Sequence, residues 1–193
     1  MAPHDDALRI FFAVEIGDAA RRAARAVAER LAAAPGGDAV RWVRPESYHV
    51  TLRFLGATPR DRVAGLVTAA QRAARAIAPF ELRLGALAGF PSRRPRAVVL
   101  DVAPHETIVA LAREVERAVV EAGFSPEQRA FHPHLTLGRV RERRAPFLDP
   151  EEHPAAAAPF AVGCFVLFQS VPATTGTQYT PLERISLGGT FSP

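Results

Sequence analysis

Lysine is absent from this sequence of 193 residues, so all 24 residues counted as Lys or Arg are arginines. The codon usage of a GC-rich genome accounts for that composition, but its consequence is physical. A guanidinium is a planar fork of donors that fits phosphate oxygens better than an ammonium group does. Together with a formal net charge of +4, this favours a polyanionic partner.

Cysteine is nearly absent as well. The single Cys164 excludes an intramolecular disulfide and a cysteine-rich metal site. No apolar run reaches the length of a membrane span, and the polar, acidic N-terminus lacks the pattern of a secretory signal. We therefore expect a soluble cytoplasmic protein that does not bind membranes.

Length and hydrophobic content limit the number of domains. A chain of 193 residues with 48% hydrophobic residues can bury one sizeable core, but it is too short for two large domains. No linker divides the chain. We expect a single domain over residues 1–193, present as a monomer.

Strand and helix signals alternate along the chain. Short runs rich in β-branched and aromatic residues predict strands, and segments between cap and stop residues predict helices. Because several predicted strands are adjacent in sequence, we expect an α+β fold with an antiparallel sheet and helices packed outside it. The predicted strands are residues 8–15, 40–43, 48–55, 80–87, 97–102, 134–140, 160–168 and 179–187. Three helices are predicted: the first is capped by Asp18, the second is capped by Thr58 with Pro59 in its first turn and runs to about residue 78, and the third covers residues 104–122. A Pro/Ala-rich loop covers residues 145–159.

One tetrapeptide pattern occurs twice, as His49-Val50-Thr51-Leu52 and His134-Leu135-Thr136-Leu137. The copies are 134 − 49 = 85 residues apart, close to half the chain. In a strand, the two-residue period sends His and Thr to one face and the aliphatic residues to the other. If the two halves are related by a pseudo-two-fold axis, two imidazoles and two hydroxyls converge on one groove.

This set of groups suits the opening of a cyclic phosphodiester by water. The reaction removes a proton from the nucleophile and gives one to the departing oxygen, in line across phosphorus. Histidine suits both tasks because its unperturbed pKa of about 6.5 allows either protonation state near neutral pH. We predict that His49 and His134 are the catalytic pair and that Thr51, Thr136 and Arg139 bind the phosphate oxygens. No metal or cofactor is needed.

Beyond the twin motif, the chain resembles the RNA 2′,3′-cyclic phosphodiesterase family, formerly called 2′-5′ RNA ligases, of the 2H phosphoesterase superfamily. The resemblance spans nearly the whole chain. It implies a bilobal fold in which two similar α/β lobes with antiparallel sheets line a central groove. The segments that carry it are residues 9–13, 41–43, 48–56, 90–92 with 94–96, 131–139, 167–170 and 176–179.

The resemblance also implies the roles and the substrate. His49 becomes the general acid and His134 the general base, an assignment that the physics of the sequence alone cannot make. The implied substrates are RNA with 2′,3′-cyclic phosphate ends or cyclic nucleotides. The implied product is a 2′-phosphate, and the reverse reaction would join ends through a 2′-5′ linkage.

Weaker candidates surround the motif. Arg53 follows the first motif at the strand period and is a candidate for a phosphate contact, with a surface ion pair as the alternative. The remaining candidates each have a structural alternative as well, because apolar strand residues are usually core and exposed loop arginines are common without a function. These candidates for contacts with RNA are Phe11 and Tyr179 by stacking, Arg93, Arg94 and Arg96 by backbone contacts, and His132 by a phosphate contact.

Two other classes of function compete with this interpretation. His49, His132 and His134 could form a three-histidine metal site with an open position for hydrolysis. That alternative gives the threonines no role. The chain could also be a catalytically silent RNA-binding module, which leaves the repeated His/Thr pair unexplained.

Overall fold

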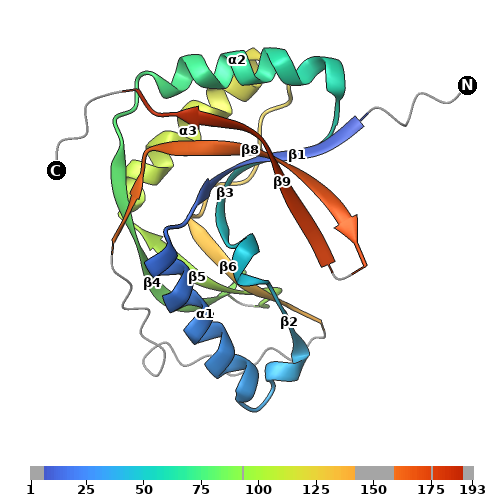
Figure 1. The fold of residues 1–193 in the computed structure, drawn as a ribbon, viewed down its shortest axis with the longest axis vertical. Coiled ribbons are helices and arrows are strands. Elements are labelled where there is room, and N and C mark those ends of the chain that lie inside the picture. The colour runs from blue at the N-terminus through green and yellow to red at the C-terminus, as the bar shows by residue number, and fades with distance from the viewer. Residues whose placement is uncertain (1–6, 93, 142–158, 175, 189–193) are drawn as a thin grey trace, which may run out of the picture.

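The computed structural model describes residues 7–92, 94–141, 159–174 and 176–188 (Figure 1). They form nine strands, three α-helices and three single-turn 3₁₀ helices at Gly37–Ala39, Pro45–Ser47 and Arg60–Arg62. In chain order the strands and α-helices are β1 (Ala7–Glu15), α1 (Asp18–Ala33), β2 (Val40–Trp42), β3 (His49–Pro59), α2 (Val63–Ala74), β4 (Phe80–Phe90), β5 (Ala97–Ala103), α3 (His105–Glu121), β6 (His134–Val140), β7 (Phe160–Val162), β8 (Cys164–Ala173) and β9 (Gly176–Ser186).

The strands form an antiparallel sheet in the order β7-β4-β5-β6-β3-β1-β8-β9, with β2 added to β6. The sheet divides into two lobes where β3 meets β6, because these strands share only the pair Val50 and Leu135. In Figure 1 one lobe, with β1, β3, β8 and β9, lies above the other, with β2, β4, β5 and β6. The expected α+β, bilobal architecture is confirmed.

Helices α1 and α3 each follow a strand of one lobe and pack against strands of the other lobe. Helix α1 follows β1 but packs against β6 and β4, and α3 follows β5 but packs against β3. The apolar side chains that α3 buries, among them Ile108, Leu111 and Val115, recur at helical spacing. The two lobes are therefore interleaved through their helices, and their facing strands are held from both sides.

Strand β1 is buried on both faces, which explains its continuous apolar run. Ile10, Phe12 and Val14 belong to the large core. Phe11 and Ala13 point to the other face, where they pack with Val166, Phe168 and the partly buried Tyr179. This smaller apolar cluster lies beside the first motif, because β1 pairs with β3.

Several boundaries differ from the sequence-based expectation, and three of the differences have a clear structural description. The helix predicted at Thr58-Pro59 is wrong at its start: β3 continues to Pro59, paired with Ala7, and α2 begins only at Val63. Residues 160–168 form two strands, β7 and β8, separated by Gly163. Asp18 is the first residue of α1 rather than its cap, where its carboxylate still stabilises the positive end of the helix dipole.

The predicted loop at residues 145–159 lies outside the described residues except for Pro159. Within the described part of the chain, no helix is both long enough and apolar enough to cross a membrane.

Candidate active site

The two motifs meet at the junction of the lobes. Val50 and Leu135, the middle residues of the motifs, are paired antiparallel and fully buried. The same register sets His49 opposite Thr136 and Thr51 opposite His134. A pseudo-two-fold axis through the central pair thus exchanges one His/Thr set for the other, as the spacing of the motifs predicts.

Both motif histidines are oriented by the same kind of hydrogen bond, from Nδ1 to the backbone carbonyl two residues earlier. The Nδ1 of His49 donates to the Ser47 carbonyl at 2.8 Å, and the Nδ1 of His134 donates to the His132 carbonyl at 2.7 Å. Because a carbonyl can only accept, each neutral imidazole carries its proton on Nδ1. Nε2 is therefore the nitrogen that each ring has available for proton transfer.

His49 is enclosed by aromatic rings. The rings of Phe11 and Tyr179 lie 5.0 Å from its imidazole, and the Phe168 ring lies 6.3 Å away. The Thr51 hydroxyl lies 3.1 Å from Nε2 and donates to it when the imidazole is neutral. The Thr51 hydroxyl is thereby hydrogen-bonded to the reacting nitrogen of His49.

This enclosure sets the charge of His49. Burial lowers its pKa to about 4, the hydrogen bond to Ser47 opposes that shift, and electrostatic repulsion from the neighbouring Arg139 and His134 adds to it. In the unliganded protein, His49 is neutral at neutral pH.

His134 lies on the more open side of the junction. Its imidazole stacks on Phe90, with ring centroids 5.0 Å apart and an interplanar angle of 22°. A hollow of about 590 Å³ opens beside it, next to Thr51 and lined by the half-exposed rings of Phe54 and Phe90. Such a hollow offers aromatic surface of the kind on which a nucleobase stacks.

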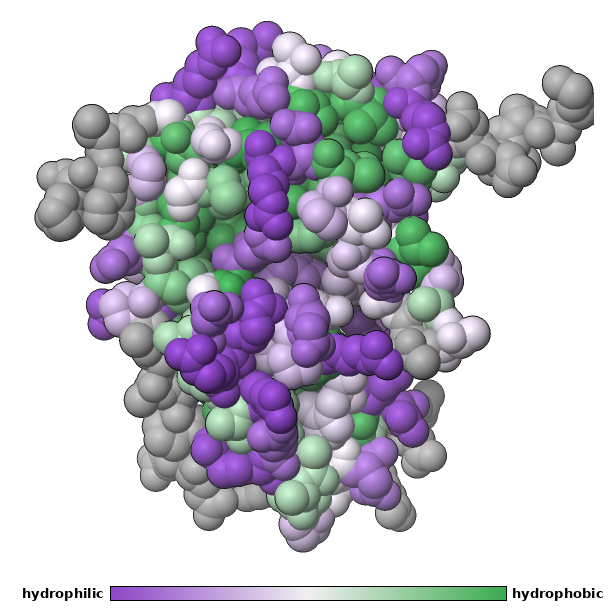
Figure 2. All heavy atoms as spheres, in the orientation of Figure 1, coloured by the Kyte–Doolittle hydropathy of each residue, from purple (hydrophilic) through white to green (hydrophobic). Residues whose placement is uncertain are grey.

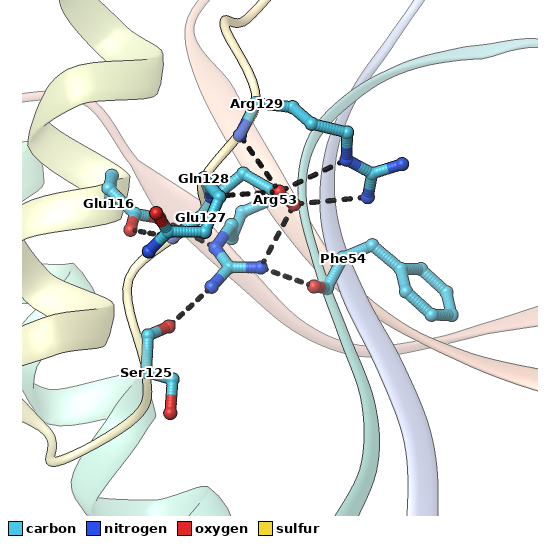
Figure 3. A network of polar contacts seen from close by, with 7 residues as sticks. All are labelled: Arg53, Phe54, Glu116, Ser125, Glu127, Gln128 and Arg129. Atoms are coloured by element: carbon cyan, nitrogen blue, oxygen red, sulfur yellow. Dashed lines mark hydrogen bonds and ion pairs between the residues drawn. The ribbon is translucent and has the colours of Figure 1, made fainter.

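Arg53 lies in a network of protein acceptors (Figure 3). Its Nε donates to Glu116 at 2.6 Å, and its two terminal nitrogens donate to the carbonyls of Phe54 and Ser125, each at 2.7 Å. Glu127 forms a second ion pair with it at 3.6 Å. Because protein groups occupy its donors, the ion pair is favoured over the predicted phosphate contact of Arg53.

Arg139 lies at the opposite end of the groove, with an exposed side chain. It lines a small hollow with Tyr179 and Ser47, and it lowers the pKa of His49. Arg139 therefore lies close to His49, and its contact with a phosphate stays a prediction.

The other predicted contact residues are scattered. Phe11 is only 2% exposed, so a base cannot stack on it without a rearrangement. Arg94 and Arg96 are exposed near the end of β4, and Arg93 lies outside the described residues. His132 is exposed beside Phe90, with ring centroids 5.9 Å apart.

Sequence reasoning missed Phe54 and Phe90 as groove residues, and it missed Arg41 and Arg44 as neighbours of Arg139. Phe54 continues the apolar alternation of Val50 and Leu52, so no local signal marks it as exposed. Phe90 follows the predicted strand of residues 80–87 and stands directly before Pro91, which was the available signal. Among the described residues, no three histidine, cysteine, aspartate or glutamate side chains form a group that could hold a metal ion. The three-histidine metal site is therefore not supported.

Comparison with known proteins identifies the fold. A family model described as "LigT like Phosphoesterase" matches residues 14–100 and again residues 100–178, one match for each half. The chain belongs to the LigT-like phosphoesterase family. A crystal structure of E. coli LigT complexed with 3′-AMP superposes with a TM-score of 0.79 at 30% identity, covering 94% of this chain and 98% of that one.

Relatives within the LigT-like family are named RNA 2′,3′-cyclic phosphodiesterase. One from Thermus thermophilus is 31% identical over 94% of this chain and 91% of its own length. One from Geobacillus stearothermophilus is 38% identical over 67% of this chain, and one from Bacillus subtilis is 38% identical over 51%. The chain spans about half the length of these last two relatives, 42% and 55% respectively.

Proposed function

We propose that this chain hydrolyses 2′,3′-cyclic phosphate ends of RNA, or 2′,3′-cyclic nucleotides, to 2′-phosphates. The observation that carries the proposal is the pair of motif strands joined at Val50 and Leu135, each presenting an imidazole with its proton on Nδ1. Two imidazoles that offer Nε2 to one groove are an acid–base pair. The name shared by the relatives supports the same reaction.

In this proposal, the phosphate lies between the two histidines. The hydroxyls of Thr51 and Thr136 and the guanidinium of Arg139 donate hydrogen bonds to its non-bridging oxygens. These donors stabilise the charge that grows on those oxygens in the pentacoordinate transition state. The register that sets each histidine opposite the other motif's threonine supports this placement.

The two histidines take different roles. His134, on the more open side, accepts a proton from water at Nε2 while the water oxygen attacks phosphorus. The bond from phosphorus to the 3′ oxygen breaks, and protonated His49 gives its Nε2 proton to that oxygen. The 2′-phosphate remains. With a 5′ hydroxyl in place of water as the attacking group, the same groups would form a 2′-5′ linkage: the bond from phosphorus to the 3′ oxygen breaks, and that oxygen again takes the proton of His49.

The low pKa of His49 fits the acid role only when substrate is present. The unliganded protein keeps His49 neutral. A phosphodiester carries one negative charge, and its attraction for a protonated imidazole is strong where water is excluded. Substrate binding therefore draws a proton onto His49, which places the general acid beside the leaving oxygen.

Hydrolysis of a panel of 2′,3′-cyclic nucleotides and short RNAs with cyclic phosphate ends tests the proposal. The products are assigned by phosphorus NMR, with and without a strong chelator. We expect 2′-phosphates and unchanged turnover in chelator. Tight RNA binding without turnover would favour the silent RNA-binding module instead, and turnover abolished by chelator would favour a metal-dependent hydrolase.

A further inference from the structure

Three arginines gather at one end of the groove. Arg41 in β2 and Arg139 in β6 are directly paired across the two strands, and Arg44 lies just after β2. All three side chains are exposed and line one hollow of about 100 Å³. The arginine end, defined here as Arg41, Arg44 and Arg139, thus collects three positive charges around one small opening.

The arginine end adjoins the catalytic residues. Its hollow is also lined by Ser47, whose carbonyl accepts the Nδ1 hydrogen of His49, and by Tyr179, whose ring lies 5.0 Å from that imidazole. Arg139 is close enough to His49 to lower its pKa. An anion in this hollow would therefore lie close to a phosphate held at His49, with only the side chains that line the hollow between them.

The arginine end differs from the Arg53 end in its ion pairs. In the described ranges, none of its three guanidiniums forms an ion pair with a carboxylate, whereas Arg53 at the other end is paired with Glu116 and Glu127. Three positive charges held close together repel one another unless an anion lies between them. The arginine end is therefore electrostatically complementary to a phosphate.

We propose that Arg41 and Arg44, beside Arg139, form a second anion subsite, which binds the phosphodiester on the 5′ side of the ribose that carries the cyclic phosphate. This inference rests on the proposed function and names the substrate class. In an RNA strand that phosphodiester is one ribose away from the cyclic phosphate, so a strand can occupy both sites at once. The subsite makes an RNA end a better substrate than a mononucleotide.

The subsite also fixes the direction of the strand. The RNA strand on the 5′ side of the terminal nucleotide leaves the groove past Arg139. Its charged backbone does not cross the other end, where Glu116 and Glu127 neutralise Arg53. The Phe54 and Phe90 hollow is then left to an uncharged part of the terminal nucleoside.

A matched pair of dinucleotides tests the subsite. Both end in a 2′,3′-cyclic phosphate; one has the normal internal phosphodiester, and the other has an uncharged methylphosphonate in its place. We expect the wild-type kcat/KM to favour the phosphodiester by about tenfold or more, the usual weight of a charge-assisted phosphate contact. In the double variant Arg41→Gln/Arg44→Gln, we expect most of that preference to disappear.

The control variant Arg22→Gln/Arg83→Gln removes the same charge from exposed positions in α1 and β4. It should keep the preference. A wild type that treats both dinucleotides alike, or a double variant that keeps the full preference, would overturn the subsite. The salt dependence gives a second readout, because removing one arginine that binds a phosphate lowers the slope of log affinity against log salt by about 0.7.

The proposed function is judged separately, by turnover of a mononucleoside 2′,3′-cyclic phosphate. If the wild type turns this over while the dinucleotide preference is absent, the subsite fails and the proposed function stands. If no cyclic phosphate is turned over, the proposed function fails, and the ratio of the Kd values of the two dinucleotides, measured by calorimetry, decides on the subsite.

Discussion

The two ends of the groove begin from similar sequence patterns and reach opposite electrostatic states. An arginine follows each motif on its own strand, Arg53 two residues after Thr51 and Arg139 three residues after Thr136. Glu116 and Glu127 pair with Arg53 (Figure 3), whereas Arg139 lies with Arg41 and Arg44 around one hollow. The repeat supplies symmetric chemistry, and its surroundings decide which arginine supports the fold and which can bind an anion.

The histidines differ in the same way. The enclosed His49 has a pKa of about 4 in the unliganded protein, while His134 stacks on a half-exposed phenylalanine beside the larger hollow. Two chemically equivalent imidazoles thus gain distinct environments, which a reaction with one acid and one base requires.

In Figure 2, hydrophilic residues gather over the lower lobe and hydrophobic ones over parts of the upper lobe.

The largest expected effect is the loss of either imidazole. His49→Ala and His134→Ala should each lower kcat by about a hundredfold or more, the usual scale of general acid–base catalysis, while the fold survives. Steady-state turnover of a 2′,3′-cyclic nucleotide, with circular dichroism as a check on folding, measures this. His105→Ala is the matched control, since His105 pairs with Asp101 on the surface. A folded variant with near-normal turnover at either position would end the two-histidine account.

The second prediction concerns acid stability and His49. Its pKa is lowered to about 4 in the folded protein, so between about pH 6.5 and 4 the unfolded chain takes up a proton that the folded chain refuses. The resulting loss of stability on acidification reaches up to about 3 kcal/mol at the lower end. Urea unfolding at pH 7 and pH 4 measures it, and His49→Gln should flatten the dependence. Equal pH dependence in the variant and the wild type would show that His49 is not held neutral by the fold.

The third prediction separates the two arginines. Arg53→Gln should lower the free energy of unfolding by about 2 kcal/mol, because Glu116 and Glu127 lose a mostly buried partner. Arg139→Gln should change stability by less than about 0.5 kcal/mol, as an exposed residue does, but lower kcat/KM about tenfold. Denaturant unfolding and kinetics on the same two variants test both halves. The reverse outcome would break the comparison.

The smallest expected effects are at the threonines. Thr51→Ala and Thr136→Ala each remove one neutral donor from a phosphate that keeps other partners, so kcat should fall by about three- to tenfold. Thr51→Ala should cost more, because its hydroxyl also touches Nε2 of His49. A threonine variant as inactive as the histidine variants, by the same turnover assay, would indicate a structural role.

The sequence predicts the chemistry better than it predicts the surroundings. The motif strands and the third helix follow from local periodicity, and the facing His/Thr pairs follow from the repeat once its two copies are related by a pseudo-two-fold axis. The start of α2 does not, because pairing of residues 56–59 with β1 overrides the local cap signal of Thr58-Pro59. The state of Arg53 depends on Glu116, 63 residues away in sequence. Arg41 meets Arg139 only because β2 pairs with β6, so no local pattern reveals the arginine end.

The pH dependence of kcat tests the unequal pair most directly. Turnover of a 2′,3′-cyclic nucleotide by the wild type should rise and fall around a maximum near neutrality, with two apparent pKa values that belong to the coupled pair. His134→Ala should lose the acidic limb and His49→Ala the basic limb, because the first lacks the base and the second the acid. Loss of the opposite limbs would exchange the two roles. A wild-type rate that only climbs through about pH 9, as hydroxide attack would give, contradicts the acid–base pair itself.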